Sequence, residues 1–544
     1  MVSPKSHRAW VLDTAGPRLV ATGGARPGRR WLTAGAWILA ALAGFAAYLR
    51  LAATRPVNSD GASQALQAWD MLHGNPLLRG WTLTDVAFYT TELPQYMLVE
   101  LVRGLGQDVV HVAAAMTYTL AVLSAALLAK GTATGREAAI RVGLAAGIML
   151  APQLVTGVNI LVSSPDHIGT SVPLMAVWLI LDRARPRWYV PVATSLLLGW
   201  AQVADALVLI AGVVPLVLVC GFRVARAAAA RQRLAAQWYD VALAGGALAA
   251  AVAAQGATRL IRAAGGYTVL PVSAQLAPVG EIIRHNLPIT GQSLLLLPGA
   301  DFRGLPMSAT TFFVMVHVVG AALAACGIAV AAWRFSGDDR VSQVLLTAIV
   351  AEVVTFAVST HATGLPAARE IAPVLPFAAA LAGRQLARPL GSARRAGRAL
   401  LPLLGAVLVA YLAGLGLEIS KPPAPPQAWQ LTSWLEHHPM GTGLSGYWEA
   451  NVVTLASGDR VAVRVVGATR TGVIAGGGLN AKAAWYDPAR SSADFVVLFP
   501  GIPGFPGFTS RGAVLATFGK PARVYRIGRY TIWYWHKNLL ADLR

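Results

Sequence analysis

Long apolar segments separated by short polar loops dominate the pattern of this sequence. A helix needs roughly 20 apolar residues to cross a bilayer, and the pattern predicts eleven such segments. They cover residues 31–52, 109–129, 141–160, 169–182, 189–203, 206–222, 238–256, 308–333, 342–360, 365–385 and 399–417. The fourth to sixth segments are short, so they could be re-entrant or merged into fewer spans. The pattern predicts an α-helical polytopic membrane domain over residues 31–417.

The first apolar segment is longer than the core of a signal peptide, which has about 7–15 residues. It begins at Trp31, directly after Arg26, Arg29 and Arg30. We therefore expect a retained helix, preceded by a cytoplasmic tail over residues 1–30.

The loops between the apolar segments alternate in charge. Every second loop is basic and carries Lys130, Arg136, Arg141; Arg183, Arg185, Arg187; Arg223, Arg226, Arg231, Arg233; Arg334, Arg340; and Arg384, Arg388, Arg394, Arg395, Arg398. The intervening loops hold Asp60, Asp85 and Glu92 in a first loop over residues 53–108, then Asp166, Asp205 and His361. The long loop over 257–307 breaks this rule, because its cations outnumber its acids. Because cytoplasmic loops carry the excess of Lys and Arg, the pattern predicts a cytoplasmic N-terminus, an extracytoplasmic C-terminus and a plasma-membrane location.

A Pro-rich linker over residues 418–426 leads to a C-terminal region of mixed character. Runs of alternating or apolar residues over 461–466, 495–499 and 530–535 predict strands. The stretches 427–437 and 509–518 predict helices. Residues 427–544 are therefore expected to form an extracytoplasmic α/β domain, whose aromatic side chains could bind a glycan or pack in its core.

The composition supports a membrane protein and argues against a nucleic-acid partner. The chain is 55% hydrophobic and 13% charged, whereas soluble domains carry about 25% charged residues. The net charge of +20 comes from cations in short runs between apolar segments. No basic stripe is interleaved with aromatics, as nucleic-acid binding would require. Membrane lipids are the expected surroundings.

The most informative polar residue is Asp60, placed where the chain leaves the first apolar segment. Acids at such a position are costly and commonly functional. A carboxylate there could act as a general base. The structural interpretation is an N-cap, because Asn-Ser-Asp-Gly before a helix is a good start signal, and the two roles are compatible.

The sequence around Asp60 resembles the multispanning GT-C glycosyltransferases, and more closely the actinobacterial membrane proteins of that superfamily. The signature S-D-G-A-S, A-W-D-M-L-H-G-N, G-W and F-Y-T-T-E-L-P occupies residues 59–63, 68–75, 80–81 and 88–94. The resemblance implies a polyprenyl-phosphate-linked sugar donor, an inverting transfer and an acid in the first outer loop, a position that Asp60 matches. For a second acid, Asp85, Glu92 and Asp166 remain open.

Further acids could contribute to a site on the outer side. Asp85 and Glu92 could bind an acceptor sugar or, with Asp60, a divalent cation such as Mg²⁺ or Ca²⁺, or they could be solvated loop acids. Asp166 and His167 lie at the end of an apolar segment. They could contact donor phosphate or acceptor, or form a turn that starts the next helix.

Cations on the predicted outer side suggest an anionic ligand. Arg369 is the best candidate for the leaving phosphate, since guanidinium binds phosphate bidentately. The alternative is an ion pair with Glu370 or with an acid of the first loop. The long loop carries Arg284, His285 and Arg303, which could bind lipid phosphate or simply contact headgroups.

These features favour a glycosyltransferase that takes a sugar from a polyprenyl-phosphate donor and adds it to a cell-envelope glycan, lipid or protein. One alternative is a transporter or flippase of a lipid-linked saccharide, for which broken helices, inverted repeats and polar residues at the midplane are typical. Another is an envelope scaffold without activity. The gathering of polar residues at the outer surface favours the enzyme.

Overall fold

The computed structural model describes residues 27–150, 156–271, 274–392, 396–438, 440–499 and 510–543. The predicted tail over residues 1–30 lies almost wholly outside this set. Residues up to Gly44 form a unit separate from the rest of the chain, so the first part of α1 (Pro27–Ala52) is described by itself. It is helical, and Trp31, Leu32 and Leu39 on it are exposed.

Helices occupy each of the eleven predicted apolar segments. After α1 they are α4 (Gln107–Lys130), α5 (Gly135–Leu150) with α6 (Thr156–Leu161), α7 (Ser171–Arg183), α8 (Tyr189–Ala204), α9 (Val214–Ala229) after the π-helical turn η1 (Leu209–Val213), α10 (Trp238–Ala263), α13 (Ala309–Val316) with α14 (Val318–Arg334), α15 (Arg340–Val358), the 3₁₀ helix η5 (Leu365–Ile371) with α16 (Val374–Ser392), and α17 (Ala396–Ile419). Within the described residues, seven helical stretches are long and apolar enough to cross a membrane, and the pair of η5 and α16, bent by 57°, would make an eighth. The chain is therefore a multi-pass α-helical membrane protein. The count of eleven spans stays a prediction.

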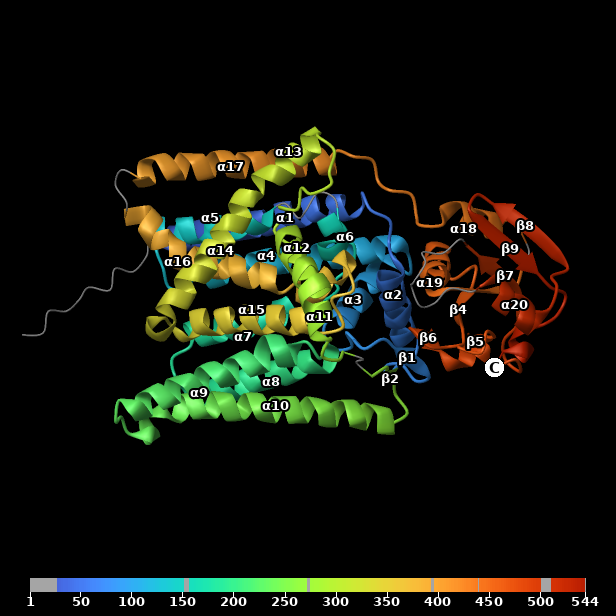
Figure 1. The fold of residues 1–544 in the computed structure, drawn as a ribbon, viewed down its shortest axis with the longest axis horizontal. Helices are drawn as coiled ribbons and strands as arrows, with labels where there is room; N and C mark the ends of the chain where they lie inside the picture. The colour runs from blue at the N-terminus through green and yellow to red at the C-terminus, as the bar shows by residue number, and fades with distance from the viewer. Residues whose placement is uncertain are drawn as a thin grey trace, which may run out of the picture. The chain divides into compact units, whose positions relative to one another are not determined.

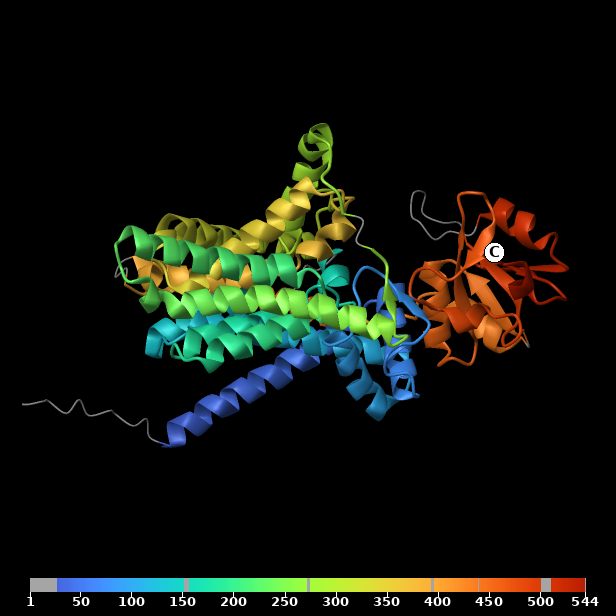
Figure 2. The same ribbon diagram turned by 90° about the horizontal axis from the view of Figure 1, so that it is seen from below.

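The central helices of the bundle pack against one another through small residues. Helix α16 lies against α4, α5, α14 and α15, while α10 packs on α8 and α9 (Figures 1 and 2). A Cβ added to Gly327 of α14 would lie 2.5 Å from the Cα of Ala382 on α16. Such close backbone approach is how membrane helices gain dispersion energy where lipid removes the hydrophobic driving force.

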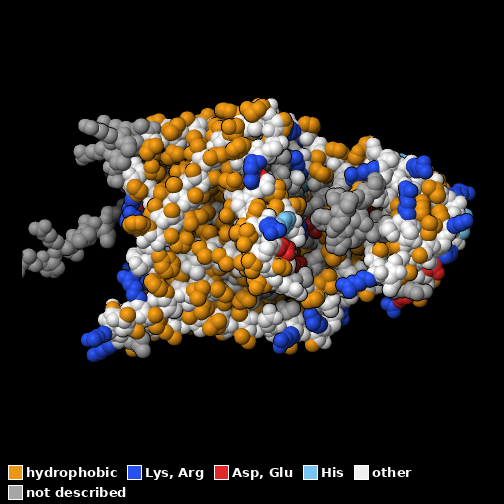
Figure 3. All heavy atoms as spheres, in the orientation of Figure 1, with side chains coloured by type: hydrophobic (Ala, Val, Ile, Leu, Met, Phe, Trp, Pro, Cys, Tyr) orange, Lys and Arg blue, Asp and Glu red, His pale blue; other side chains and the backbone are white. Residues whose placement is uncertain are grey.

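The basic residues at one end of the bundle form ion pairs between helices. Arg384 donates to the carbonyl oxygen of Leu128 and lies 2.9 Å from carboxylate oxygens of both Asp182 and Asp339. In Figure 3, Lys and Arg also gather at the left-hand end of the helical part, while hydrophobic side chains cover its length. This asymmetry agrees with the alternation of the loops, although which side faces the cytoplasm stays a prediction.

The loops at the opposite end contain secondary structure of their own. The first loop forms α2 (Ser59–Leu72), β1 (Trp81–Leu83) and α3 (Glu92–Arg103). The long loop, predicted over 257–307, begins inside α10 and forms β2 (Thr268–Val269), α11 (Val279–Glu281), η3 (Ile282–Asn286) and α12 (Leu287–Leu296). Strand β1 pairs with β2 in parallel and with β6 (Ala481–Lys482) of the C-terminal domain in antiparallel.

The C-terminal region is an α/β domain, as the pattern predicts. Its strands are β3 (Thr442–Ser445), β4 (Val463–Ala468), β5 (Ile474–Gly476), β7 (Ala493–Leu498), β8 (Arg523–Ile527) and β9 (Tyr530–Tyr534), in the order β5-β4-β3-β7-β9-β8. The three central strands are parallel and the outer pairs antiparallel. Helices α18 (Trp429–Glu436), α19 (Tyr447–Ala456) and α20 (Arg511–Phe518) accompany the sheet, and two separate apolar clusters form its core.

The close contact of α14 with α16 predicts the effect of a single methyl group. Gly327→Ala should lower the free energy of unfolding by about 1–3 kcal/mol, because the helices must move apart. Gly245→Ala is the matched control, since nothing lies within 4 Å of a Cβ there and alanine favours a helix. Thermal unfolding in detergent measures both, and equal midpoints would contradict the predicted packing.

Candidate active site

Asp60 lies in the first turn of α2, and its carboxylate does not cap the helix. Asn58 caps this helix, because its Oδ1 accepts a hydrogen bond from the backbone N–H of Gly61 at 2.9 Å. The N-cap interpretation of Asp60 is therefore wrong. A Cβ on Gly61 would lie 2.6 Å from Val110 on α4, so glycine allows the start of α2 to approach the bundle.

Arg369, on η5, is the centre of the charged cluster. Its Nη1 lies 3.1 Å from Oδ2 of Asp60 and 3.7 Å from Oδ2 of Asp166, and its Nε lies 3.5 Å from Oε1 of Glu370. The two structural alternatives, a pair with Glu370 and a pair with a first-loop acid, thus occur together. Binding of phosphate by Arg369 stays a prediction.

His167 extends the cluster into the bundle. Its Nδ1 lies 2.9 Å from Asp205 and its Nε2 lies 3.2 Å from Glu370. Burial by itself would lower the pKa of His167, but the carboxylates of Glu370 and Asp205 raise it well above its usual value. A charged imidazolium between two carboxylates joins the loop before α7, the loop after α8, and η5.

A polar pocket of about 480 Å³ opens beside this cluster. Its lining comes from the first loop, the loop before α7, η5 and the C-terminal domain: Asp60, Ser63, Gln64, Gln67, Thr84, Asp85, Val86, Phe88, Asp166, His167, Arg369, Glu370 and Asn480. Among the described residues, no hydrogen-bond or ion-pair partner of the Asp85 carboxylate is found. Four carboxylates thus face one guanidinium and one imidazolium.

A second pocket of about 680 Å³ adjoins the first and shares Asp85, Val86, His167 and Glu370 with it. The surface that the second pocket exposes is mostly apolar, although polar side chains also contribute to it. The rest of its lining comes from η1 and its preceding loop, α15 and the neighbouring loops: Asp205, Ala206, Leu207, Ile210, Ala274, Glu352, Thr355, Phe356, Ser359, His361 and Ile371. A polar compartment and a largely apolar one therefore meet at Asp85.

The structure brings five of the predicted site residues together at the polar pocket, namely Asp60, Asp85, Asp166, His167 and Arg369. Glu92 lies behind it, buried and hydrogen-bonded to the hydroxyl of Thr91. A Cβ on Gly169 would collide with its carboxylate. Glu92 lines neither pocket, so a direct contact with acceptor or metal has no geometric support.

The predicted cations of the long loop lie away from both pockets. Arg284 and His285 are exposed, and Arg303 pairs with Asp301 at 3.0 Å. Their binding of an anionic ligand stays a prediction.

Two residues of the pocket region come from the C-terminal domain and were not predicted from the sequence. The hydroxyl of Tyr447 donates to Oδ1 of Asp60 at 2.6 Å, and Asn480 lines the pocket. Neither lies in a motif that suggests chemistry, since one begins a short helix and the other follows a glycine-rich turn.

The predicted divalent cation finds no ready ligand set among the described residues, where no group of three His, Cys, Asp or Glu side chains is placed to hold a metal. The carboxylates of Asp60 and Asp166 face the guanidinium of Arg369 instead. Metal dependence stays a prediction, and no step below is assigned to a metal.

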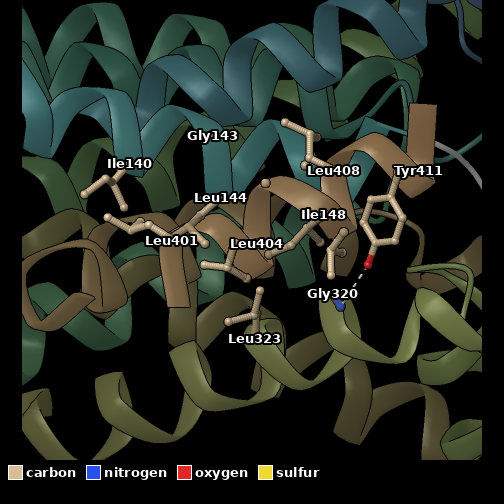
Figure 4. Close-up of a pocket in the computed structure, with 13 residues that line it drawn as sticks. Ile140, Gly143, Leu144, Ile148, Gly320, Leu323, Leu401, Leu404, Leu408 and Tyr411 are labelled. Atoms are coloured by element: carbon tan, nitrogen blue, oxygen red, sulfur yellow. Dashed lines mark hydrogen bonds between the residues drawn. The ribbon is translucent and has the colours of Figure 1, made fainter. Parts of the chain in front are cut away.

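A third cavity, separate from the two pockets, is similar in volume but different in its lining. It measures about 630 Å³ and lies among α5, α14 and α17 (Figure 4). Ile140, Leu144, Leu404 and other apolar side chains line it, and the hydroxyl of Tyr411 accepts a hydrogen bond from the N–H of Gly320 at 3.0 Å. No charged side chain contributes to this described lining, so the cavity offers no chemistry.

The fold is shared with solved membrane proteins. ArnT from Cupriavidus metallidurans in the apo state is 15% identical, with a TM-score of 0.54 over 95% of this chain and 100% of that chain. The chain therefore shares the fold of ArnT. ArnT from the same organism bound to undecaprenyl phosphate is 17% identical, with a TM-score of 0.51 over 94% of this chain and 98% of that chain.

The remaining comparisons identify no family for this chain. The Archaeoglobus fulgidus oligosaccharyltransferase, tethered with an acceptor peptide, is 14% identical with a TM-score of 0.49 over 86% of this chain and 70% of that chain. No family model matches the sequence, and no curated protein matches it.

The burial of Glu92 predicts a pH dependence of stability. Burial raises the pKa of Glu92 to about 8, so the folded protein binds this proton more tightly than the unfolded chain does. Between the ordinary value near pH 4.3 and about pH 8, wild-type stability should fall relative to Glu92→Gln by up to about 1.4 kcal/mol per pH unit. Unfolding midpoints measured in detergent from pH 4.5 to 8.5 test this, and a difference that does not change with pH would contradict it.

Proposed function

We propose that this protein is a membrane glycosyltransferase that moves a sugar from a polyprenyl-phosphate donor to a cell-envelope acceptor, with inversion, on the outer face of the plasma membrane. The observation that carries the proposal is the pairing of Asp60 with Arg369 in a polar pocket that adjoins a largely apolar one. A fold hosts many functions, so the chemistry of this site bears most of the weight.

The two compartments suit an amphiphilic donor. The sugar and phosphate would occupy the polar pocket, and the first prenyl units would lie against Leu207, Ile210 and Phe356 in the apolar one. Support for this class of donor comes from ArnT of Cupriavidus metallidurans, which has been crystallised bound to undecaprenyl phosphate. The resemblance of the first loop to GT-C enzymes points the same way.

The reaction would be a single displacement. The acceptor hydroxyl oxygen bonds to the anomeric carbon while the bond from that carbon to the phosphate oxygen breaks. The hydroxyl proton passes to a carboxylate acting as general base, and the polyprenyl phosphate leaves as an anion. Arg369 would stabilise the charge that develops on the phosphate, and its side chain is 40% exposed at the pocket.

Asp60 is the proposed base, and Asp85 is its rival. The oxygens of Asp60 already accept from Arg369 and Tyr447. Asp85 lines both pockets, where the described residues offer its carboxylate no partner. A free carboxylate at the junction of the compartments is well placed to receive a proton, so the assay must separate the two acids.

The outer loop and the C-terminal domain have supporting roles in this proposal. Arg284, His285 and Arg303 would contact phosphate headgroups of the lipid or donor. The C-terminal domain would face the acceptor, which is an envelope glycan, lipid or protein.

Replacing the base should abolish transfer. Membranes that contain wild type, Asp60→Asn or Asp85→Asn are given a panel of radiolabelled polyprenyl-phosphate sugars. Loss of the general base should reduce transfer by about a hundredfold or more. Asp108→Asn is the matched control, because Asp108 lies in the same loop region and forms an exposed ion pair with Arg103.

The pattern of loss assigns the base. Loss in Asp60→Asn alone supports Asp60, and loss in Asp85→Asn alone transfers the role to Asp85. Equal transfer in all variants would remove both acids from the chemistry. An absence of transfer from every donor, with endogenous acceptors supplied, would favour transport or scaffolding.

Arg369 should dominate binding of the leaving group. Arg369→Gln should weaken the affinity for undecaprenyl phosphate about tenfold or more, because hydrogen bonds between charged groups are lost. The thermal shift of the detergent-solubilised protein with increasing undecaprenyl phosphate measures this. The control is Arg388→Gln, which changes an exposed arginine that pairs with Glu137 at the other end of the bundle. Equal affinity in both variants would refute the assignment.

A further inference from the structure

The C-terminal domain contacts the carboxylate of Asp60 directly. Tyr447 is the first residue of α19, and its buried hydroxyl donates to Oδ1 of Asp60 at 2.6 Å. Arg369 holds the other oxygen, Oδ2, at 3.1 Å. The two oxygens of one carboxylate are thus fixed by a membrane-bundle residue and by a residue of the C-terminal domain.

Asn480 sets the direction of the hydrogen bond from Tyr447. Its Oδ1 accepts from the backbone N–H of Thr84 at 3.3 Å, and because a backbone N–H can only donate, the orientation of the amide is fixed. Its Nδ2 then donates to the hydroxyl oxygens of Ser63 at 3.0 Å and Tyr447 at 3.1 Å. The hydroxyl proton of Tyr447 must therefore point to Asp60.

Tyr447 stays protonated, so its hydrogen bond to Asp60 is kept. Burial, together with the nearby charge of Asp60, raises the pKa of Tyr447 well above its usual value. The hydroxyl stays a donor at any pH at which the protein would work. Asn480 itself has φ +47°, in the left-handed region where asparagine is tolerated better than most residues.

Polar and apolar contacts dock the domain around this point. Lys482 lies 2.8 Å from Asp70 of α2, and its strand β6 pairs with β1 of the first loop. Val452 and Leu455 of α19 are buried in one cluster with Ala62, Val110 and other residues of α2, α3 and α4. The contact between Tyr447 and Asp60 therefore belongs to an extended interface.

We infer that the C-terminal domain completes the active site. Tyr447 is a positioning residue that orients the Asp60 carboxylate. Asn480 orients Tyr447 and contacts the sugar bound in the pocket. The catalytic part of this inference rests on the proposed function. The inference predicts that the active site has all its residues in place only while the C-terminal domain contacts the first loop.

The test compares two tyrosines of the same domain in the full-length protein. Tyr447→Phe removes the hydroxyl that faces Asp60, and Tyr486→Phe removes a partly buried hydroxyl that donates to the carbonyl oxygen of Val465. Loss of a hydrogen bond to a charged group should lower kcat about tenfold or more, with the KM for the donor within about twofold of wild type. Tyr486→Phe should keep the wild-type kcat. Equal kcat values in the two variants would overturn the inference while leaving the proposed function intact.

A measurement without turnover separates the two proposals. Thermal midpoints are measured for Asp60→Asn, Tyr447→Phe and the double variant, and contacting residues should give non-additive changes. If wild type transfers no sugar, the proposed function fails, and the changes in thermal midpoint alone test the inference. Non-additive changes support completion of the site by the C-terminal domain, and additive changes refute it. If Tyr447→Phe does not fold, Asn480→Gly, which keeps the backbone conformation at φ +47°, takes its place in both measurements. The inference is then overturned if Asn480→Gly has the same kcat as Tyr486→Phe, or if its effect on the thermal midpoint adds to that of Asp60→Asn.

Discussion

The ion pair between Arg369 and Asp60 is the interaction on which the candidate site depends. The two residues are 309 positions apart, and their contact joins η5 to the start of α2. From Arg369 the charges continue through Glu370 and His167 to Asp205. The pair of His167 with Asp205 is buried, and removing one partner of a buried pair typically costs about 3–5 kcal/mol. Arg369 is 40% exposed, so its pairs contribute less to stability. Each member of the cluster therefore constrains the positions of the others.

Apolar contacts around the cluster hold these charges in register. Gly61 lets α2 approach α4, and a shared apolar core beneath α2 includes residues of α19. The charged residues alone would not fix the geometry, because exposed ion pairs contribute little to stability. Packing excludes water on one side of the cluster, while the polar pocket keeps the opposite side accessible to a substrate.

The meeting of a polar and a largely apolar compartment at Asp85 gives the site its chemical character. A substrate with a charged head and an apolar tail can satisfy both compartments at once, which neither a free sugar nor a plain lipid would do. The apolar cavity of Figure 4 lacks this combination, and it illustrates why lining chemistry is more informative than size. The fold shared with ArnT provides the scaffold, and the residues at this junction provide the chemistry.

The amino-acid sequence alone predicted a multi-pass helical membrane protein, though not its number of spans, together with the α/β character of the C-terminal region and the position of Asp60 just after the first apolar helix. These features are local: an apolar run of sufficient length, or an alternation of apolar and polar residues, needs no distant partner to be recognised. The pairing of Arg369 with a first-loop acid was one of two alternatives at the sequence level, and only the tertiary structure showed that it coexists with the pair to Glu370.

Other parts of the site were decided by tertiary structure alone. Glu92 and Asp85 are both acids of the first loop, yet packing buries one behind Gly169 and leaves the other facing the pockets. Tyr447 reaches Asp60 across 387 positions of the chain, and no motif near it indicates that contact. Local patterns specify which residues are helical or charged. The docking of separate segments specifies which charges share a pocket, because that depends on side chains meeting from elements that are remote in sequence.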